Sequence, residues 1–196
     1  MTSRVELRWP ADADRRLQAD VHRVLHAVVE RGGAIGYLAP PTRAETDAWL
    51  DEILTLVRAG DASLVLAVAE GRVVATGLWR RGPKPVFGHS AEVQKVMAHP
   101  AARGLGLGRT VTEALVDDAR KAGIETLTLG VRGNNHGAIE LYERLGFREW
   151  GRLPNFIAVG DERYDDVRMS LDLGRAPNVV LRGSPADGPG SSPRRG

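Results

Sequence analysis

A glycine-rich segment between a predicted strand and a predicted helix constrains this chain more than any other feature. Residues 103–108 read Arg-Gly-Leu-Gly-Leu-Gly, after the strand-like residues 92–98 and before the helix-like residues 109–122. Glycines in such a turn leave backbone N–H groups accessible, and the start of a helix adds partial positive charge. The segment therefore predicts a binding site for a phosphate or pyrophosphate group.

The spacing of these glycines excludes two common phosphate-binding loops. A Walker loop ends in Gly-Lys-Ser/Thr, whereas Arg109 and Thr110 follow Gly108 in this chain. A dinucleotide-binding loop has the pattern G-x-G-x-x-G, but only Leu107 separates Gly106 from Gly108. The pattern that remains is R-x-x-G-x-G, which runs from Arg103 to Gly108.

This pattern resembles the acyl-CoA pyrophosphate loop of the GNAT family of N-acetyltransferases. A second segment supports the resemblance, because Asn135, Ala138, Leu141, Tyr142 and Gly146-Phe147 are spaced like the family's second signature, a short helix carrying Asn and Tyr. The similarity covers roughly residues 90–150. It implies that acetyl-CoA is the cofactor and that the acceptor is a primary amine of a small molecule, either a metabolite or an antibiotic or toxin. Residues 151–154, Gly-Arg-Leu-Pro, are weakly similar to members that act on such toxins.

Hydrophobic periodicity and turn signals predict an α/β domain. The resemblance implies a single-domain fold with a mixed central β-sheet, helices on both faces, and two central strands that splay apart to form the cofactor cleft. Strands are expected at residues 5–9, 63–69, 72–80, 92–98, 126–131, 147–152 and 164–173, and helices at residues 17–28, 43–59, 109–122 and 136–145. The predicted domain covers residues 1–173, and the tail 174–196, rich in Pro, Gly and Arg, is expected to be disordered.

Charge and composition exclude several classes of function. The formal net charge is +2, but the tail holds four arginines against one aspartate, so the domain itself is close to neutral and no nucleic-acid partner is expected. The chain has no cysteine, and its other polar residues show no metal-ligand spacing, so no metal is expected. No signal peptide or apolar run of membrane-spanning length occurs, which predicts a cytoplasmic protein without a membrane partner.

The resemblance also implies which residues hold the cofactor. Backbone groups of residues 96–98 would pair with the pantetheine arm, and the amides of the glycine-rich turn would bind the pyrophosphate. The N–H group of Met97 or Ala98 is a candidate oxyanion donor. The full set of implied cofactor-binding residues is Val96, Met97, Ala98, Arg103, Gly104, Leu105, Gly106, Leu107, Gly108, Arg109, Asn135 and Tyr142.

Two side chains are the candidate catalytic groups. Tyr142 matches the family's general acid, which protonates the thiolate of coenzyme A. Glu92 resembles the family's general-base glutamate, and strand alternation would place it on the same face as Val96 and Ala98. His89 is an alternative base because its ordinary pKa suits the task, and ordered water is a third possibility. His89 lies in a loop rich in proline and glycine, however, and its side chain is expected to face solvent.

The acceptor pocket is the part that the sequence constrains least. The resemblance maps it to residues 34–41, with Tyr37, and to residues 153–164, and Asp165 and Asp166 begin the final strand beside the second segment. The acidic groups there would either hold a cationic amine or form a solvated turn. Two other functions stay open: acetylation of a protein N-terminus or lysine, and a catalytically silent acyl-CoA-binding module. The last strand, residues 164–173, is expected to allow pairing between protomers, so a homodimer is possible.

Overall fold

Seven strands form one mixed sheet in the order β1-β2-β3-β4-β5-β7-β6, in a computed structural model that describes residues 5–175. The strands are β1 (Glu6–Arg8), β2 (Ala62–Ala69), β3 (Arg72–Arg81), β4 (Ser90–Ala98), β5 (Thr126–Arg132), β6 (Arg148–Val159) and β7 (Glu162–Asp172). The α-helices are α1 (Arg15–Glu30), α2 (Arg43–Ala59), α3 (Leu107–Lys121) and α4 (His136–Arg144). The predicted order of strands and helices is confirmed; of the predicted tail, all but Gly174 and Arg175 lies outside the described residues.

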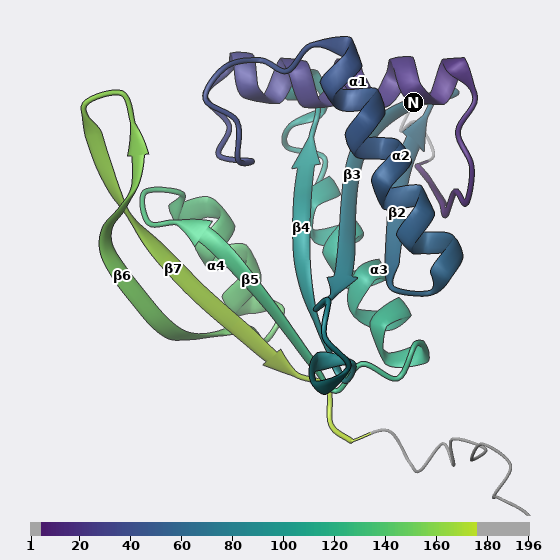
Figure 1. The fold of residues 1–196 in the computed structure, drawn as a ribbon. Helices are drawn as coiled ribbons and strands as arrows, with labels where there is room; N and C mark the ends of the chain where they lie inside the picture. Colours follow the sequence, from purple (N-terminus) through teal and green to yellow (C-terminus); the bar gives the residue numbers. More distant parts are fainter. Residues whose placement is uncertain (1–4, 176–196) are drawn as a thin grey trace, which may run out of the picture.

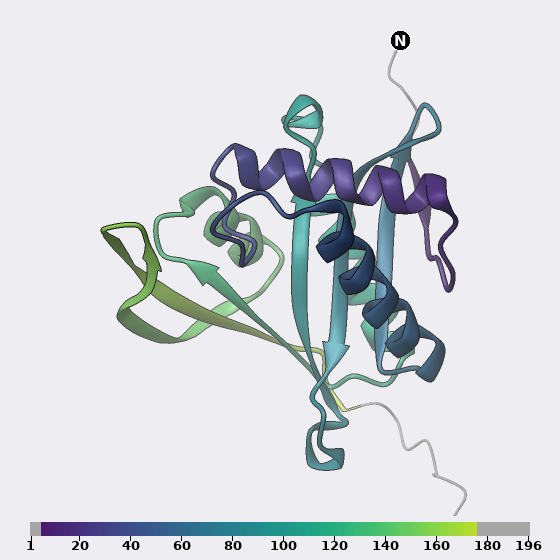
Figure 2. The same cartoon turned by 45° about the horizontal axis from the view of Figure 1, so that its top comes forward.

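Two hydrophobic cores cover the two faces of the sheet. One core contains Val21, Leu25, Leu50 and Ile53 of α1 and α2, packed on β2 and β3. The other contains side chains of α3 together with β4, β5 and β7, and it extends to Phe147 after α4. Figures 1 and 2 show α1 and α2 on one side of the sheet and α3 on the other. The prediction of helices on both faces is therefore confirmed.

The sheet separates between β4 and β5, which are its only parallel neighbours within the described residues. These strands pair only through residues 90–92 of β4 and residues 126–128 of β5. Beyond that point they diverge, and the sheet has the shape of a V in Figures 1 and 2. The structure confirms the predicted splayed strands, with the β1–β4 lobe on one side and the β5–β7 lobe on the other.

Local sequence signals explain where several elements begin and end. Thr42 and Glu45 form a capping box at the start of α2, and Gly60 ends that helix in the left-handed conformation, with φ of +80°. Glu70 and Gly71 both have positive φ and close the β2–β3 hairpin. These boundaries depend on neighbouring residues in the chain, which is why they could be predicted.

A β-bulge in β4 changes which way its side chains point. Leu78 of β3 lies opposite Gln94, whereas Thr76 lies opposite Met97, so β4 contains one extra residue at Lys95–Val96. Lys95 has a φ of +51°, and its carbonyl accepts a hydrogen bond of 3.0 Å from the buried Thr76 hydroxyl. The bulge therefore inverts strand alternation between the two halves of β4.

The last hairpin differs from the prediction. Residues 153–164 were expected to be a loop, but β6 continues to Val159 and β7 begins at Glu162. The ladder has an irregularity between Leu153 and Ile157, which tolerates Pro154 within the strand because no ladder hydrogen bond is needed there. β7 lies between β5 and β6, so the edge strand at this end of the sheet is β6 and not the last strand of the chain.

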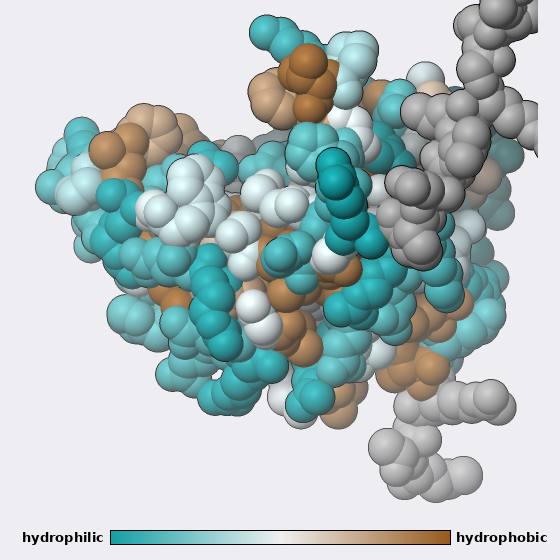
Figure 3. All heavy atoms as spheres, turned by 90° about the horizontal axis from the view of Figure 1, so that it is seen from below, coloured by the Kyte–Doolittle hydropathy of each residue, from teal (hydrophilic) through white to brown (hydrophobic). Residues whose placement is uncertain are grey.

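Exposed hydrophobic side chains are scattered over the described surface. The large ones lie on different elements, for example Trp9, Leu38, Phe87 and Trp150. Figure 3 shows one face on which hydrophilic surface predominates and hydrophobic side chains gather in small, separate patches. No helix among residues 5–175 is long and apolar enough to cross a membrane.

We predict that Gly77→Ala destabilises the fold. A Cβ atom at Gly77 of β3 would lie 2.5 Å from Val111 Cγ1 and 3.0 Å from Leu115 Cδ1, so an added methyl group would push α3 away from the sheet. The expected loss in free energy of unfolding is about 1–3 kcal/mol, measured by urea denaturation. Gly151→Ala in β6 is the control, because its nearest contact would be an ordinary 4.0 Å. Equal losses in both variants would contradict close packing at Gly77.

Candidate active site

A cavity of about 1360 Å³ occupies the space between the two lobes. This volume exceeds that of most small-molecule sites, which are about 300–1,000 Å³, so it has room for a cofactor and a second substrate. Its walls come from the α1–α2 loop, β4, the glycine-rich turn, the end of β5, α4, the end of β6 and part of β7. Residues far apart in the sequence therefore meet in one cavity.

The start of α3 provides the anion-binding end of this cavity. Gly106 is the N-cap, no side chain caps the helix, and no acidic residue lies in its first turn. The first N–H groups of a helix lack acceptors within the helix, and the helix dipole favours an anion there. Gly104 and Gly106 have φ of +83° and +69°, so the turn requires the left-handed conformation that glycine adopts without strain.

The other residues of this turn have different surroundings. The helix begins at Leu107 rather than at the predicted Arg109, so Gly108 belongs to α3, where a Cβ atom would lie 3.3 Å from Leu141 Cδ2 of α4. Leu107 is buried in the core, whereas Leu105 is 63% exposed. Arg103 lines the cavity, and Arg109 also lines it while pairing with Glu113 at 2.8 Å.

The second half of β4 presents a strand edge to the cavity. No strand pairs with β4 on its β5 side beyond Glu92, so main-chain groups of residues 96–98 on that side are available to a ligand. Their side chains pack elsewhere: Met97 lies in the core beneath α1 and α2, and Val96 and Ala98 lie against the other core. These residues therefore offer backbone rather than side-chain contacts.

Tyr142 combines burial with access to the cavity. The side chain is 8% exposed, lines the cavity, and packs edge-to-face on Phe147 with ring centroids 5.7 Å apart. Burial disfavours the charged phenolate and raises the pKa of Tyr142 to about 12. The phenol thus keeps its proton at neutral pH. Asn135, predicted beside it, lines the cavity and caps α4 by accepting a hydrogen bond of 3.4 Å from the Ala138 N–H.

Glu92 lies where β4 and β5 separate. Its Oε2 accepts a 2.6 Å hydrogen bond from Gln94 Nε2, and its Oε1 accepts one of 3.3 Å from Arg168 Nη1. Arg168 also pairs with Asp166 at 2.8 Å, so one guanidinium joins carboxylates from both lobes. The expectation that Glu92 shares a face with Val96 and Ala98 is wrong, because the bulge at Lys95 inverts the alternation between them.

The histidines considered from the sequence lie outside this arrangement. His89 is exposed and does not line the cavity, and its carbonyl accepts hydrogen bonds from the N–H groups of Glu125 and Thr126. The Nδ1 atom of His99 accepts a hydrogen bond from the Ala101 N–H, which caps a short 3₁₀ helix. Over the described part of the chain, no cluster of three or more His, Asp or Glu residues could hold a metal ion.

The acceptor end of the cavity contains some of the predicted residues and four that sequence reasoning missed. Residues 34–38, with Tyr37, and residues 157–159 of the hairpin line it as predicted, whereas Asn155, Phe156, Asp161 and Glu162 do not. Asp165 pairs with Arg152 at 3.2 Å. The missed residues are Lys95, Arg132, Asp166 and Arg168. A single sequence gives no signal that separates them from surface charges, because a bulge and a hairpin pairing bring them together.

Comparisons with known proteins agree with this geometry. The sequence pattern of the acetyltransferase (GNAT) family matches residues 9–147. The chain is 39% identical over 83 residues to [ribosomal protein bS18]-alanine N-acetyltransferase of Escherichia coli K12, which covers 42% of this chain and 56% of that protein. It is 33% identical over 144 residues to L-methionine sulfoximine/L-methionine sulfone acetyltransferase of Pseudomonas aeruginosa, covering 71% of this chain and 80% of that protein.

A solved structure shares the fold. A GNAT superfamily phosphinothricin acetyltransferase from Sinorhizobium meliloti, in complex with acetyl-CoA, superposes with a TM-score of 0.73 at 21% identity, over 93% of this chain and 96% of that one. The chain spans about half the length of the E. coli relative. The chain belongs to the acetyltransferase (GNAT) family.

We predict that Gly106→Ala weakens binding of coenzyme A. The substitution forces alanine into the left-handed region, at a cost of about 1–2 kcal/mol, in the turn that presents the N–H groups of α3. Binding of coenzyme A, measured by calorimetry, should weaken at least tenfold. Gly123→Ala is the matched control: Gly123 follows the other end of α3 with φ of +74° and equally open surroundings, so it should lose stability but not affinity. A similar loss of affinity in both variants would contradict a local role for Gly106.

Proposed function

We propose that this protein is an acetyl-CoA-dependent N-acetyltransferase that acetylates a primary amine of a small molecule. One observation carries the proposal: a single cavity contains the uncapped start of α3, the buried phenol of Tyr142 and the carboxylate of Glu92. The start of α3 is suited to bind a pyrophosphate. The phenol can act as a proton donor, and the carboxylate can act as a proton acceptor. An acyl transfer from a thioester to an amine needs all three.

The residues present fit acetyl-CoA. The turn from Arg103 to Arg109 would hold the pyrophosphate through main-chain N–H groups, and the free edge of β4 at residues 96–98 would hold the extended arm. Asn135, at the start of α4, lines the cavity beside the arm's path. When bound, acetyl-CoA supplies an activated acetyl group on a thioester.

Three groups of the chain divide the proton and charge transfers. Glu92 accepts the proton that the acceptor's ammonium group must lose before its nitrogen can attack. The N–H group of Met97 or Ala98 donates to the carbonyl oxygen as that oxygen gains negative charge. Tyr142 gives its proton to the departing sulfur, and its raised pKa keeps that proton available. The nitrogen loses its second proton as the amide forms, and this proton restores the phenol.

The nature of the acceptor is the finer part of the proposal. The relatives named above act on a ribosomal protein's alanine, on methionine sulfoximine or sulfone, and on phosphinothricin. The acceptor end of this cavity has both charge signs, with Arg168 paired to Glu92 and Asp166. Such a lining favours a small amine that also carries a polar or anionic group. A protein N-terminus is the second candidate, favoured by the 39% identity to the bS18-alanine enzyme.

A thiol-release assay tests the proposal. Acetyl-CoA is offered with amino acids and their sulfoximine or phosphinic analogues, aminoglycosides, polyamines and short peptides. Release of coenzyme A that depends on a small amine supports the proposed function. Turnover confined to peptides would support the protein acceptor instead. If no amine is turned over while coenzyme A still raises the melting temperature, the proposed enzymatic function is overturned and a catalytically silent acyl-CoA-binding module is favoured.

We predict that Tyr142→Phe lowers kcat by roughly 10²-fold, the usual contribution of a general acid. The ring and its contact with Phe147 are kept, so the melting temperature should change little. For the wild type, kcat/KM should rise with pH as the acceptor amine loses its proton. As the pH is raised further, kcat/KM should show no decrease up to about pH 10, because the pKa of Tyr142 is raised to about 12. A Phe variant with wild-type kcat would eliminate Tyr142 as the acid.

For Glu92→Gln we predict a loss in kcat/KM of roughly 10²-fold at pH 7, which shrinks as the pH rises and the amine arrives without its proton. Steady-state rates from pH 6 to 10 measure this. Glu52→Gln, an equivalent change on α2 at a residue that pairs with Arg80 and does not line the cavity, should leave the profile unchanged. A loss of the same size at every pH would mean that Glu92 positions groups without accepting a proton, and no loss would point to water as the base.

A further inference from the structure

The loop between α1 and α2 crosses the open end of the cleft. Residues 32–38 line the same cavity as the ends of β4 and β5. Figures 1 and 2 show this loop above the space between the two lobes, across from the β6–β7 hairpin. The cleft is therefore closed below by the β4–β5 pairing and spanned above by seven loop residues.

Lys95 holds this loop from the β4 wall. Its ammonium group donates a hydrogen bond to the Ile35 carbonyl and lies 4.6 Å from the centre of the Tyr37 ring, in cation–π contact. The side chain can reach the loop because Lys95 is the bulged residue, with a φ of +51° that a lysine adopts only at a cost. Burial also lowers the pKa of Lys95. Lys95 therefore has both an unfavourable backbone conformation and a buried ammonium group. A side chain with these two costs is expected to have a specific role, here in holding the loop.

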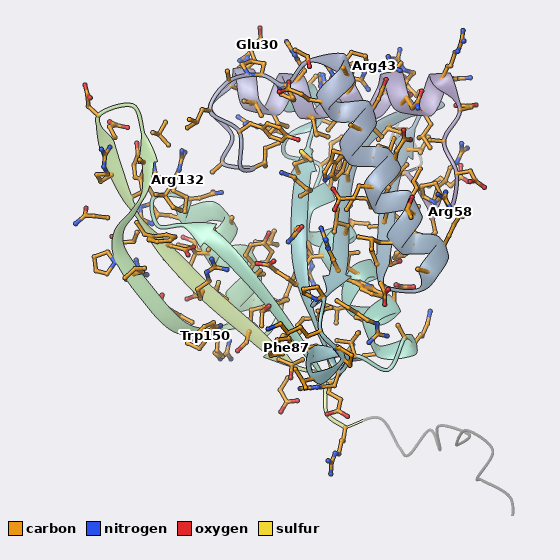
Figure 4. All side chains as sticks on the ribbon, viewed as in Figure 1. Glu30, Arg43, Arg58, Phe87, Arg132 and Trp150 are labelled. Carbon is orange, nitrogen blue, oxygen red and sulfur yellow. The ribbon has the colours of Figure 1, made fainter. Side chains whose placement is uncertain are left out.

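Arg132 holds the loop from the β5 wall. Its Nη2 donates to the Gly32 carbonyl at 3.4 Å, its Nε donates to Asn134 Oδ1 at 2.7 Å, and its guanidinium lies 4.7 Å from the centre of the Tyr164 ring. One side chain thus connects the loop to the β6–β7 hairpin. Figure 4 labels Arg132 in this position, between the hairpin and the loop.

The loop itself is built to accept these two contacts. Gly32 and Gly36 have φ of +76° and +87°, and a Cβ atom at Gly33 would lie 2.7 Å from the Val28 carbonyl oxygen, so the turn needs glycine at each position. Ile35 and Tyr37 pack against the core beneath α1 and α2. The two carbonyls are therefore presented in a fixed geometry toward the cations.

We propose that Lys95 and Arg132 pin the α1–α2 loop as a roof over the acceptor end of the cleft, and thereby select small amines over peptides. A roof joined to both walls covers part of the cleft, which hinders a folded protein surface more than a small amine. The pinning follows from the contacts alone, whereas the selectivity rests on the proposed function. Lys95 and Arg132 are in this sense positioning residues, which act through the loop.

Hydrogen exchange tests the pinning without any assay of activity. Lys95→Met keeps the aliphatic chain and removes the ammonium, and Lys95→Arg restores a cation. Amides of residues 33–38 should exchange at least tenfold faster in the Met variant than in the wild type, and the Arg variant should recover part of the protection. Lys121→Met, an exposed lysine at the end of α3, is the matched control. Unchanged exchange in Lys95→Met would overturn the pinning, whatever the enzyme's activity.

Kinetics with a small amine and a peptide test the selectivity. Lys95→Met should raise KM for the small amine about tenfold, leave KM for acetyl-CoA and kcat nearly unchanged, and increase the relative kcat/KM for a peptide acceptor. Arg132→Gln should act in the same direction, and the double variant should show less than the product of the two effects because both release one loop. Faster exchange with an unchanged preference would overturn the selectivity alone. Absence of turnover in the wild type would instead count against the proposed function.

Discussion

The candidate site depends on the separation of two neighbouring strands. β4 and β5 share only three residue pairs, and each then continues in a different lobe with its own helices. Because the separation leaves one edge of β4 without a partner strand, main-chain groups that a continuous sheet would satisfy internally remain available to a ligand. The same separation creates the cavity and brings Glu92, at the last shared pair, to its closed end.

The cavity contains three chemically different environments. At one end the first turn of α3 offers N–H groups and the positive end of a helix dipole. In the middle, apolar packing around Tyr142 raises the pKa of the phenol and so keeps it neutral. At the far end, Glu92, Asp166 and Arg168 form an ion-paired network that includes both lobes. Each environment suits one part of an acyl transfer, namely binding the donor, protonating the leaving group and receiving the amine.

The two lobes are joined by apolar packing on one face of the sheet and by polar contacts across the cleft. The core beneath α3 contains side chains of β2, β3 and β4 together with those of β5 and β7. The links across the cleft are hydrogen bonds, from Arg168 to Glu92 below and from Arg132 to the Gly32 carbonyl above. Polar contacts of partly exposed groups are individually weak. The apolar core therefore holds the walls of the site more firmly than these hydrogen bonds hold the roof.

The sequence by itself determined the features that depend on neighbouring residues. Local backbone preferences account for the glycine-rich turn and its helix, the capping box at Thr42, the hairpin at Glu70–Gly71 and the helix carrying Tyr142. The first and the last of these carry the resemblance to the family whose pattern matches residues 9–147. Only the tertiary structure decided the acceptor end. A single extra residue at Lys95 inverted the alternation that placed Glu92. The pairing of β7 with β5 brought Arg168 into the cavity, and the continuation of β6 beyond Pro154 brought residues 157–159 there. Strand register and bulges depend on contacts between distant segments, which no local pattern in one sequence records.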